Sequence, residues 1–239
     1  ELARSINSLA AGLEEGERRQ KQLTSDIAHE LRTPLTCLQG DIEAMIDGVY
    51  QPDREHLESL HGETLRLARL VQDLNTLTCL EWDTITLNKT GFDAAALLST
   101  TAEQFWAAAR EKGIEIKLDL IESPITADYD RLKQVFINLL SNAVKYTDEG
   151  GVTISVTRSG GSGAAWEIAV ADTGIGIPEG DLPHIFERFY RADKSRSRST
   201  GGAGIGLTIA AAIVHAHGGT ITAESGGASA GGCIFRVVL

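Results

Sequence analysis

The sequence predicts a multidomain protein with two fold classes, an all-α helical hairpin followed by an α+β sandwich, in which helices cover one face of a sheet. Residues 1–83 contain almost no turn residues, and their apolar positions repeat at helical spacing. From residue 84 onward, short segments of alternating apolar and polar residues are interleaved with helical stretches. These two observations place a domain boundary at about residue 83.

The helical part is expected to begin with one long helix over residues 1–48. Apolar residues follow one another there at steps of four, three, four and three, the spacing of a coiled-coil seam: Leu31, Leu35, Leu38, Ile42 and Met45. A helix stop follows in DGVYQPD (47–53), and a second helix carries leucines at seven-residue intervals from Leu60 to Leu74. Because such a hairpin cannot bury its seam alone, we expect a homodimer in which two copies pair as a four-helix bundle.

The α+β part is expected to contain both strands and long helices. The strands are predicted at 114–120, 152–158, 166–171, 220–225 and 233–238. The helices are predicted at about 93–112, 128–146 and 204–217. The glycine-rich segments 159–163 and 226–232 are expected to be hairpin loops.

Composition and charge exclude some classes of function. The net charge of −11 argues against nucleic-acid binding, because a phosphate-binding surface needs clustered cations. Nothing resembles a signal peptide or a membrane-spanning apolar run, so this chain is expected to be soluble even if its parent is longer. Cys37, Cys79 and Cys233 lie far apart without C-x-x-C spacing, which favours reduced thiols in a cytosolic setting over a zinc site or a disulfide.

A polar cluster interrupts the first predicted helix in SDIAHELRTPL (25–35). His29 and Glu30 begin a pattern one residue short of H-E-x-x-H, and Thr33 replaces the second ligand, so a zinc protease is disfavoured. A histidine on a helix is usually structural. Here it is accompanied by a carboxylate, by a hydroxyl one turn later, and by Pro34, which weakens nearby backbone hydrogen bonds and permits a bend. We therefore interpret His29 as a nucleophile that a mobile domain must reach.

The segment FINLLSNAVKYT (136–147) places polar groups along one face of a predicted helix. Asn138 and Asn142 are four residues apart, and Lys145 lies one turn further. The amide oxygens could ligate Mg²⁺, and the ammonium could meet a phosphate oxygen, so the stripe suits a metal-bound polyphosphate. A solvated helix face is the more common explanation for such a stripe taken alone.

Two glycine-rich segments lie further along the chain. In DTGIGIP (172–178), Asp172 can accept a hydrogen bond from an exocyclic amine, and Gly174 and Gly176 permit close backbone approach; a simple glycine turn is the alternative. GGAGIGL (201–207) precedes an apolar helix whose amides could cradle phosphate. It matches neither a Walker loop nor the Rossmann fingerprint. The basic residues of 188–198 directly before it form either an anion site with this segment or a solvated loop.

In their order, these motifs resemble those of the sensor histidine kinases of bacterial two-component systems. HELRTPL is similar to the H box, NLLSNAVKYT to the N box, DTGIGI and GGAGIGL to the two G boxes, and FERFYR to the F box. The resemblance covers residues 20–239 and is to the orthodox class, which has no attached receiver domain. Residues 1–20 resemble the last helix of the HAMP linker of membrane-bound members. Ile205 departs from the family, which more often has leucine there.

The resemblance implies three segments: a HAMP-like signalling helix to residue 20, a dimerisation and histidine phosphotransfer domain over 21–83, and a catalytic ATP-binding domain of the gyrase/Hsp90 type over 84–239. It implies that His29 is the phosphoacceptor, that Glu30 is its acid–base partner, and that Thr33 positions water for regulator dephosphorylation. Asn142 and Asn138 would bind Mg²⁺, Lys145 the phosphates, Tyr146 the nucleoside and Asp172 the adenine amine. Gly174 and Gly176 would shape this pocket. The lid over the phosphates would contain Arg188, Arg191, Gly202, Gly204, Gly206 and Leu207.

The implied function is ATP-dependent autophosphorylation of His29, followed by phosphotransfer to an aspartate of a response regulator and by regulator phosphatase activity. The chain would be the cytoplasmic portion of a bacterial membrane sensor. Two alternatives are weighed. A gyrase- or Hsp90-like ATPase uses a carboxylate to activate water, but Asn138 stands at the corresponding position. A non-catalytic dimer adaptor is disfavoured because Asn142, Asp172 and the glycines are intact.

Overall fold

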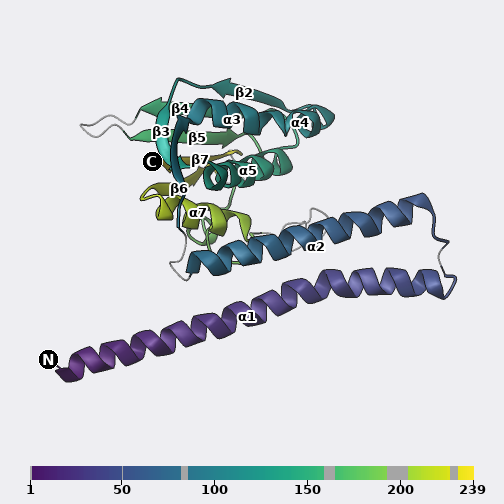
Figure 1. The fold of residues 1–239 in the computed structure, drawn as a ribbon. Helices are drawn as coiled ribbons and strands as arrows, with labels where there is room; N and C mark the ends of the chain where they lie inside the picture. Colours follow the sequence, from purple (N-terminus) through teal and green to yellow (C-terminus); the bar gives the residue numbers. More distant parts are fainter. Residues whose placement is uncertain (1, 50, 82–85, 159–164, 193–203, 227–230) are drawn as a thin grey trace. The chain divides into compact units, whose positions relative to one another are not determined.

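The computed structural model describes residues 2–49, 51–81, 86–158, 165–192, 204–226 and 231–239. The chain divides into two compact units, Glu1–Asn75 and Thr76–Leu239, and the helices and strands of each are labelled in Figure 1. The fold class is the predicted one, an α-helical hairpin followed by an α+β domain.

The first unit is built from two long helices that run in opposite directions. Helix α1 spans Leu2–Ile46 and passes through Pro34 without interruption, and α2 spans Arg54–Glu81. Gly48, with φ +75, lies in the turn between them. The Asp53 carboxylate accepts a hydrogen bond from the His56 amide at 2.9 Å, which satisfies one orphan donor at the start of α2. The predicted hairpin is confirmed.

The hairpin leaves several large apolar side chains exposed. Among the side chains that the structure describes on the two helices, these are Leu35, Ile42, Ile46, Leu57, Leu65 and Val71. Leu35 and Ile42 belong to the seam that the leucine spacing predicts. Because Leu35 and Ile42 are seven residues apart, they lie on one face of α1, which favours that face as an interaction surface.

The second unit contains a five-stranded sheet in the order β2-β4-β5-β7-β6. Its strands are β2 (Glu115–Asp119), β4 (Gly151–Arg158), β5 (Trp166–Asp172), β6 (Thr220–Ser225) and β7 (Cys233–Val238). The β2–β4 pair is parallel, and the other pairs are antiparallel. All five strands were predicted. Residues 159–163 and most of 226–232, the predicted hairpin loops, lie outside the described residues.

A separate two-stranded sheet was not predicted. It pairs β1 (Lys89–Asp93) with β3 (Pro124–Asp128) in antiparallel register. Each strand has five residues and contains Gly91 or Pro124, so neither shows the alternation that identifies a strand. The prediction of one helix over 93–112 was wrong in detail. It is two helices, α3 (Ala94–Glu103) and α4 (Trp106–Lys112), separated at Gln104 and Phe105 by turns whose amides bond three residues back.

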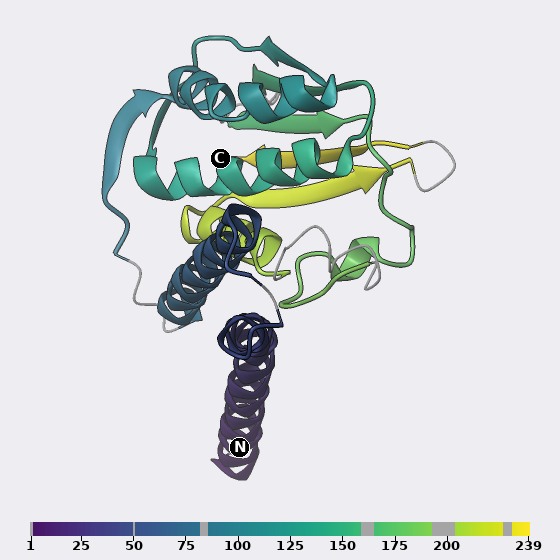
Figure 2. The same ribbon diagram turned by 90° about the vertical axis from the view of Figure 1, so that its right-hand side faces the viewer.

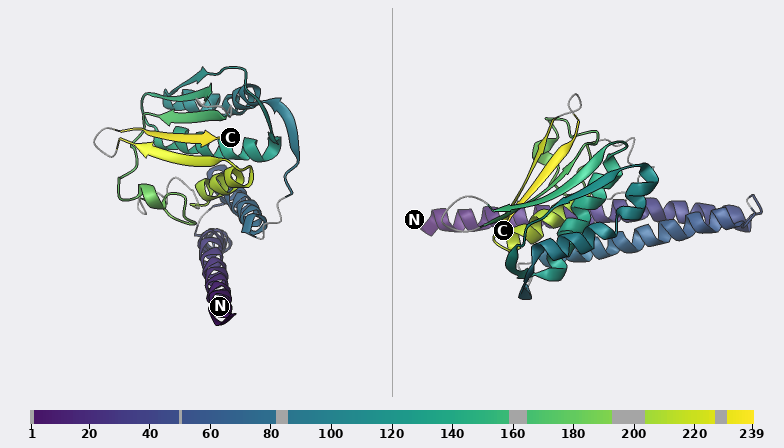
Figure 3. Two further views of the ribbon diagram at one scale, coloured as in Figure 1. Left: turned by 90° about the vertical axis from the view of Figure 1, so that its left-hand side faces the viewer. Right: turned by 90° about the horizontal axis from the view of Figure 1, so that it is seen from above.

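Three helices cover one face of the large sheet, as Figures 2 and 3 show: α3, α5 (Tyr129–Tyr146) and α7 (Gly206–Ala216). Helix α5 is central to this layer. Its buried residues recur at helical spacing: Leu132, Val135, Phe136, Leu139, Leu140, Ala143 and Val144. Because this stripe faces the core, Asn138, Asn142 and Lys145 remain half-buried at its edge.

Candidate functional site

The histidine cluster lies in the helical unit. The side chain of His29 is exposed, that of Glu30 is half-buried, and Pro34 is buried. The Thr33 hydroxyl donates a hydrogen bond to the His29 carbonyl oxygen at 3.3 Å. Pro34 has no N–H, so it cannot bond to the Glu30 carbonyl four residues earlier. The backbone around His29 is therefore less constrained than in an ordinary helix, while the imidazole is open to an incoming group.

The polar stripe of α5 lies in the second unit. The Asn138 side-chain amide donates to the carbonyl oxygen of Gly206, the first residue of α7, at 2.9 Å. This bond joins the two helices and leaves the Asn138 amide oxygen as an acceptor. The Lys145 Nζ lies 4.8 Å from the centroid of the Tyr146 ring, a cation–π contact. The structure thus brings together the start of α7 and the stripe that the sequence predicts.

Asp172 ends β5 in a partly buried position. Its Oδ1 accepts a hydrogen bond from the Gly174 amide at 2.9 Å. Burial raises the pKa of Asp172 above its ordinary value, although hydrogen bonds from the Gly174 and Cys233 amides partly offset this. Burial, together with the Asp172 charge, also raises the pKa of Cys233 to about 12, so this cysteine remains a neutral thiol near pH 7. The result is a partly buried carboxylate that backbone amides hold in place.

The glycine segment 172–177 is clamped from two sides. On one side, the Ile175 amide donates to the Tyr146 carbonyl at 3.2 Å, and a Cβ on Gly174 would overlap that carbonyl. On the other side, the Gly232 amide donates to the Gly174 carbonyl at 2.7 Å. Gly176 has φ +71, which favours glycine. The close approach to Tyr146 gives a steric reason for glycine at 174.

The sequence did not identify Ser225 as part of this clamp. Its hydroxyl accepts from the Ile177 amide at 2.7 Å and donates to the Gly232 carbonyl at 3.0 Å. The two partners lie 48 and 7 residues away in the chain, and an isolated serine at the end of a strand carries no motif. Only the fold brings these groups together.

The predicted lid is described only at its two ends. Arg188, Arg191, Gly204, Gly206 and Leu207 are described, whereas Gly202 and the other basic residues of 194–198 lie outside the described residues. The Phe189 amide donates to the Gly204 carbonyl at 3.0 Å, and both residues have left-handed backbones, with φ +59 and +71. A left-handed phenylalanine is uncommon and costs conformational energy. This backbone bond brings the two ends together.

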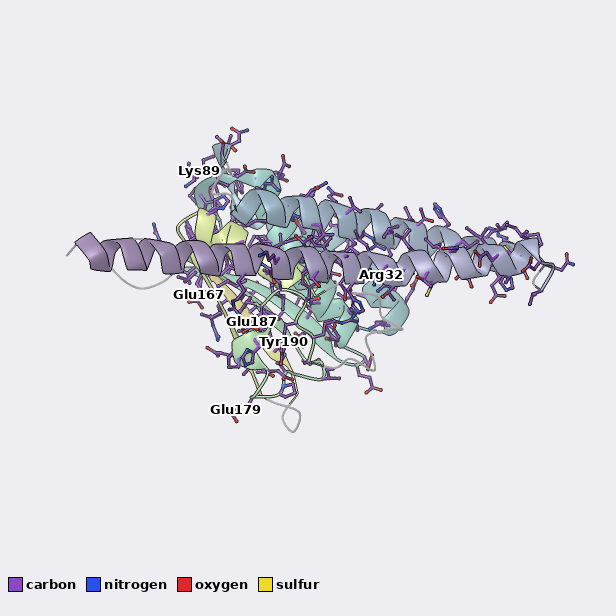
Figure 4. The ribbon with its side chains drawn as sticks, turned by 90° about the horizontal axis from the view of Figure 1, so that it is seen from below. Arg32, Lys89, Glu167, Glu179, Glu187 and Tyr190 are labelled. Carbon is purple, nitrogen blue, oxygen red and sulfur yellow. The ribbon has the colours of Figure 1, made fainter. Side chains whose placement is uncertain are left out.

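The segment 181–190, which leads into the predicted lid and includes its first residues, carries its own polar contacts. The Tyr190 hydroxyl donates to Asp181 at 2.6 Å, and a ring nitrogen of His184 lies 2.7 Å from Glu187. Figure 4 labels Glu187 and Tyr190 on this stretch. The hydrogen bond to Asp181 raises the pKa of Tyr190. These contacts fix the part of the chain that leads into the predicted lid.

In the part of the chain that the structure describes, no three His, Cys, Asp or Glu side chains are grouped so that they could hold a metal ion. No described helix is both long enough and apolar enough to cross a membrane.

Comparison with known proteins gives two family matches. The His Kinase A (phospho-acceptor) domain model matches residues 19–81. The model described as histidine kinase-, DNA gyrase B-, and HSP90-like ATPase matches residues 127–239. Between them, the two matches include His29 and the whole of α5, the glycine segment and α7.

Curated and solved relatives agree with these matches. Signal transduction histidine-protein kinase BaeS of Escherichia coli K12 is 37% identical over 223 residues, which are 93% of this chain and 47% of that protein. Acinetobacter baumannii histidine kinase AdeS matches with a TM-score of 0.74 and 34% identity, over 88% of this chain and 96% of that chain. A complex of histidine kinase ThkA with response regulator protein TrrA matches with a TM-score of 0.70 and 26% identity, over 91% of this chain and 61% of that one.

The chain joins a helical hairpin with an exposed histidine to an α+β domain that matches the ATPase model. This combination is that of a histidine kinase. The chain belongs to the sensor histidine kinases of bacterial two-component systems. It spans about half the length of curated relatives such as BaeS. The likeness of residues 1–20 to a HAMP helix stays a prediction.

Proposed function

We propose that this chain is the kinase core of a sensor protein, which phosphorylates His29 with ATP and passes the phosphoryl group to an aspartate of a response regulator. The observation that carries the proposal is the exposed His29 within the phosphoacceptor match, in the same chain as an ATPase-type domain. We take residues 21–83 as the phosphotransfer domain and 84–239 as the catalytic domain.

Nucleotide binding would depend on Asp172 and on the end of α5. The Asp172 carboxylate is an acceptor suited to the adenine amine, and backbone amides already hold its orientation. Lys145 would meet the phosphates, and Tyr146 would lie beside the nucleoside. Gly174 and Gly176 would shape the base pocket. Arg188, Arg191, Gly202, Gly204, Gly206 and Leu207 would belong to the lid.

The amide oxygens of Asn142 and Asn138 fit a magnesium site shared with the phosphates. Mg²⁺ prefers oxygen ligands and usually takes only one or two of them from the protein, the others coming from phosphate and water. The bond from the Asn138 side-chain amide to Gly206 leaves its oxygen for this purpose. When bound, Mg²⁺ would supply charge neutralisation at the phosphates. The two asparagines would orient it, and the lid arginines would add positive charge.

In the first step, neutral His29 attacks the γ-phosphorus of ATP through Nε2. A nitrogen–phosphorus bond forms, the bond from phosphorus to the bridging oxygen breaks, and ADP leaves. Positive charge develops on the imidazole, and the adjacent Glu30 carboxylate would stabilise this charge and accept the Nδ1 proton, which leaves a neutral phosphohistidine ring. The phosphoryl group then passes to a regulator aspartate. Thr33 would position water during dephosphorylation of the regulator, and its hydroxyl must first leave the His29 carbonyl.

Partners and cellular location belong to the same proposal. Exposed apolar residues along both helices support a homodimer through the hairpin. The solved ThkA–TrrA complex supports a response regulator as partner. Since the chain matches about half the length of relatives named sensor histidine kinases, such as YkoH and YclK of Bacillus subtilis, we propose that the parent protein is anchored in the bacterial membrane and that this part lies in the cytoplasm.

The test is labelling of the purified chain with Mg²⁺ and radioactive ATP. An acid-labile, alkali-stable phosphate should form, as expected for phosphohistidine. His29→Gln should abolish labelling and leave ATP binding nearly unchanged, because the two sites lie in different units. His61→Gln, at an exposed position of α2, is the matched control and should label normally. Labelling that persists in His29→Gln would contradict the assignment of the acceptor.

A further inference from the structure

A lysine from a neighbouring helix holds the last turn of α5. The Lys112 Nζ donates hydrogen bonds to three backbone carbonyl oxygens, those of Val144 at 3.0 Å, Lys145 at 2.9 Å and Thr147 at 3.1 Å. Lys112 is the final residue of α4, and Gly113, with φ +71, ends that helix directly after it. An ammonium group has three N–H donors, and all three find an acceptor here.

These bonds complete the pairing of the carbonyl groups at the end of α5. The last four carbonyls of a helix have no partner within the helix. The Tyr146 carbonyl accepts from Ile175, and the Ala143 carbonyl accepts from both the amide and the hydroxyl of Thr147. Lys112 binds the carbonyls of Val144 and Lys145. Its positive charge also lies at the negative end of the helix dipole, where a cation is stabilising.

The turn that Lys112 holds is the one that carries proposed nucleotide contacts. Lys145 and Tyr146 are its last two residues. Its backbone also abuts the glycine segment, because Ile175 bonds to the Tyr146 carbonyl and Gly174 packs against that same carbonyl. Any displacement of this turn would therefore move Tyr146 and the segment after Asp172 together.

We propose that Lys112 is a positioning residue for nucleotide binding. By fixing the last turn of α5 from outside the pocket, it sets the place of Tyr146 and, through the Tyr146 carbonyl, that of residues 174–175. Lys112 itself does not touch the nucleotide. The inference rests on the proposed function, since it assumes that Tyr146 and the glycine segment meet ATP.

Three variants of the purified chain separate this role from others. Lys112→Met keeps an unbranched apolar stem and removes the charge and all three donors. Lys112→Arg keeps the positive charge and several donors, although in a planar group. Lys117→Met is the matched control, because Lys117 is an exposed lysine on β2 whose ammonium lies 3.2 Å from the Glu115 carboxylate.

The measurements are the Kd for a fluorescent ATP analogue, the KM and kcat of autophosphorylation, and the Tm. In Lys112→Met, the Kd and KM should rise about tenfold, since several bonds to a charged group are lost. The kcat at saturating ATP should stay within about twofold, because full occupancy restores the pocket. Lys112→Arg should recover most of the affinity, and Lys117→Met should behave as the unaltered chain.

A lowered Tm with unchanged Kd and KM in Lys112→Met would show that Lys112 only stabilises the fold, and would overturn the inference. If that variant fails to fold, Lys112→Gln, which keeps an amide donor, takes its place, and unaltered affinity there would have the same meaning. Absence of nucleotide binding in the unaltered chain would contradict the proposed function instead, so the two failures can be distinguished.

Discussion

The carboxylate of Asp172 is kept in place by backbone groups while its surroundings disfavour its charge. Burial raises its pKa, and the Gly174 and Cys233 amides oppose that effect. A carboxylate in such a site is held in one orientation and is poorly hydrated, so it gains much from a ligand that donates a hydrogen bond. Because protonation would remove the negative charge and turn one carboxyl oxygen into a donor, ATP affinity should fall as the pH is lowered toward this raised pKa.

Asp172→Asn tests this residue directly. The amide can present an N–H where the carboxylate presents only acceptors, so ATP affinity should fall by about tenfold or more and preference over GTP should shrink. Competition binding of ATP and GTP measures both effects. Asp119→Asn, at an exposed position of β2, serves as the control. An unchanged preference for ATP over GTP would show that Asp172 does not recognise the base.

At the scale of elements, α5 determines the site more than any other segment. One stripe of the helix packs in the core, so its register fixes where the polar stripe emerges. At its end it meets the glycine segment, where the Tyr146 carbonyl leaves no room for a side chain at 174. The proposed base pocket would therefore be bordered by two backbone segments in contact, the end of α5 and residues 174–175.

Gly174→Ala should disrupt this contact. The added methyl group would overlap the Tyr146 carbonyl, and backbone on both sides must move. We expect a loss of stability of about 1–3 kcal/mol, as for other overpacked sites, and severe loss of ATP binding. Gly180→Ala is the matched control, because a Cβ there meets nothing within 4 Å. Thermal unfolding and nucleotide titration of both variants measure these effects. Equal stability and equal ATP affinity of the two variants would show that the Tyr146 carbonyl does not require glycine at position 174.

Periodicity explains why most elements could be predicted. Both arms of the hairpin, the five strands of the large sheet and α5 carry apolar residues at regular spacing, so these elements can be read in the sequence. Strands β1 and β3 lack such a pattern. The partners of Asn138, Lys112 and Ser225 lie 68, 32 and 48 residues away, and no local pattern encodes contacts of that range. The site residues could therefore be proposed from motifs, whereas the contacts that hold these residues in place could not be predicted.

At the scale of the whole molecule, the hairpin is expected to join two chains. Its exposed apolar residues include Ile42, which is 46% exposed and belongs to the predicted seam. Burying these residues against a second copy would give the hairpin the core that two helices cannot form alone. Dimerisation would then be a property of the first unit, separate from nucleotide binding in the second.

Ile42→Glu should convert the dimer into monomers, because a carboxylate would have to be buried in the seam without a partner. Light scattering after size exclusion gives the mass of each species. Leu118→Glu, at an exposed position of β2, is the control and should remain dimeric. ATP affinity should be kept in both variants. A dimer that survives Ile42→Glu would place the interface elsewhere.

The edge of the large sheet bears on the same question. Strand β2 has a partner on one side only, and an open strand edge is a template on which further chains can add and aggregate. Along β2, every second residue is charged: Glu115, Lys117 and Asp119 are all exposed. An incoming strand would have to strip water from this row of alternating charges. The β2 edge is therefore protected against growth, and association of the chain is expected at the hairpin instead, where pairing with one further copy would complete the bundle.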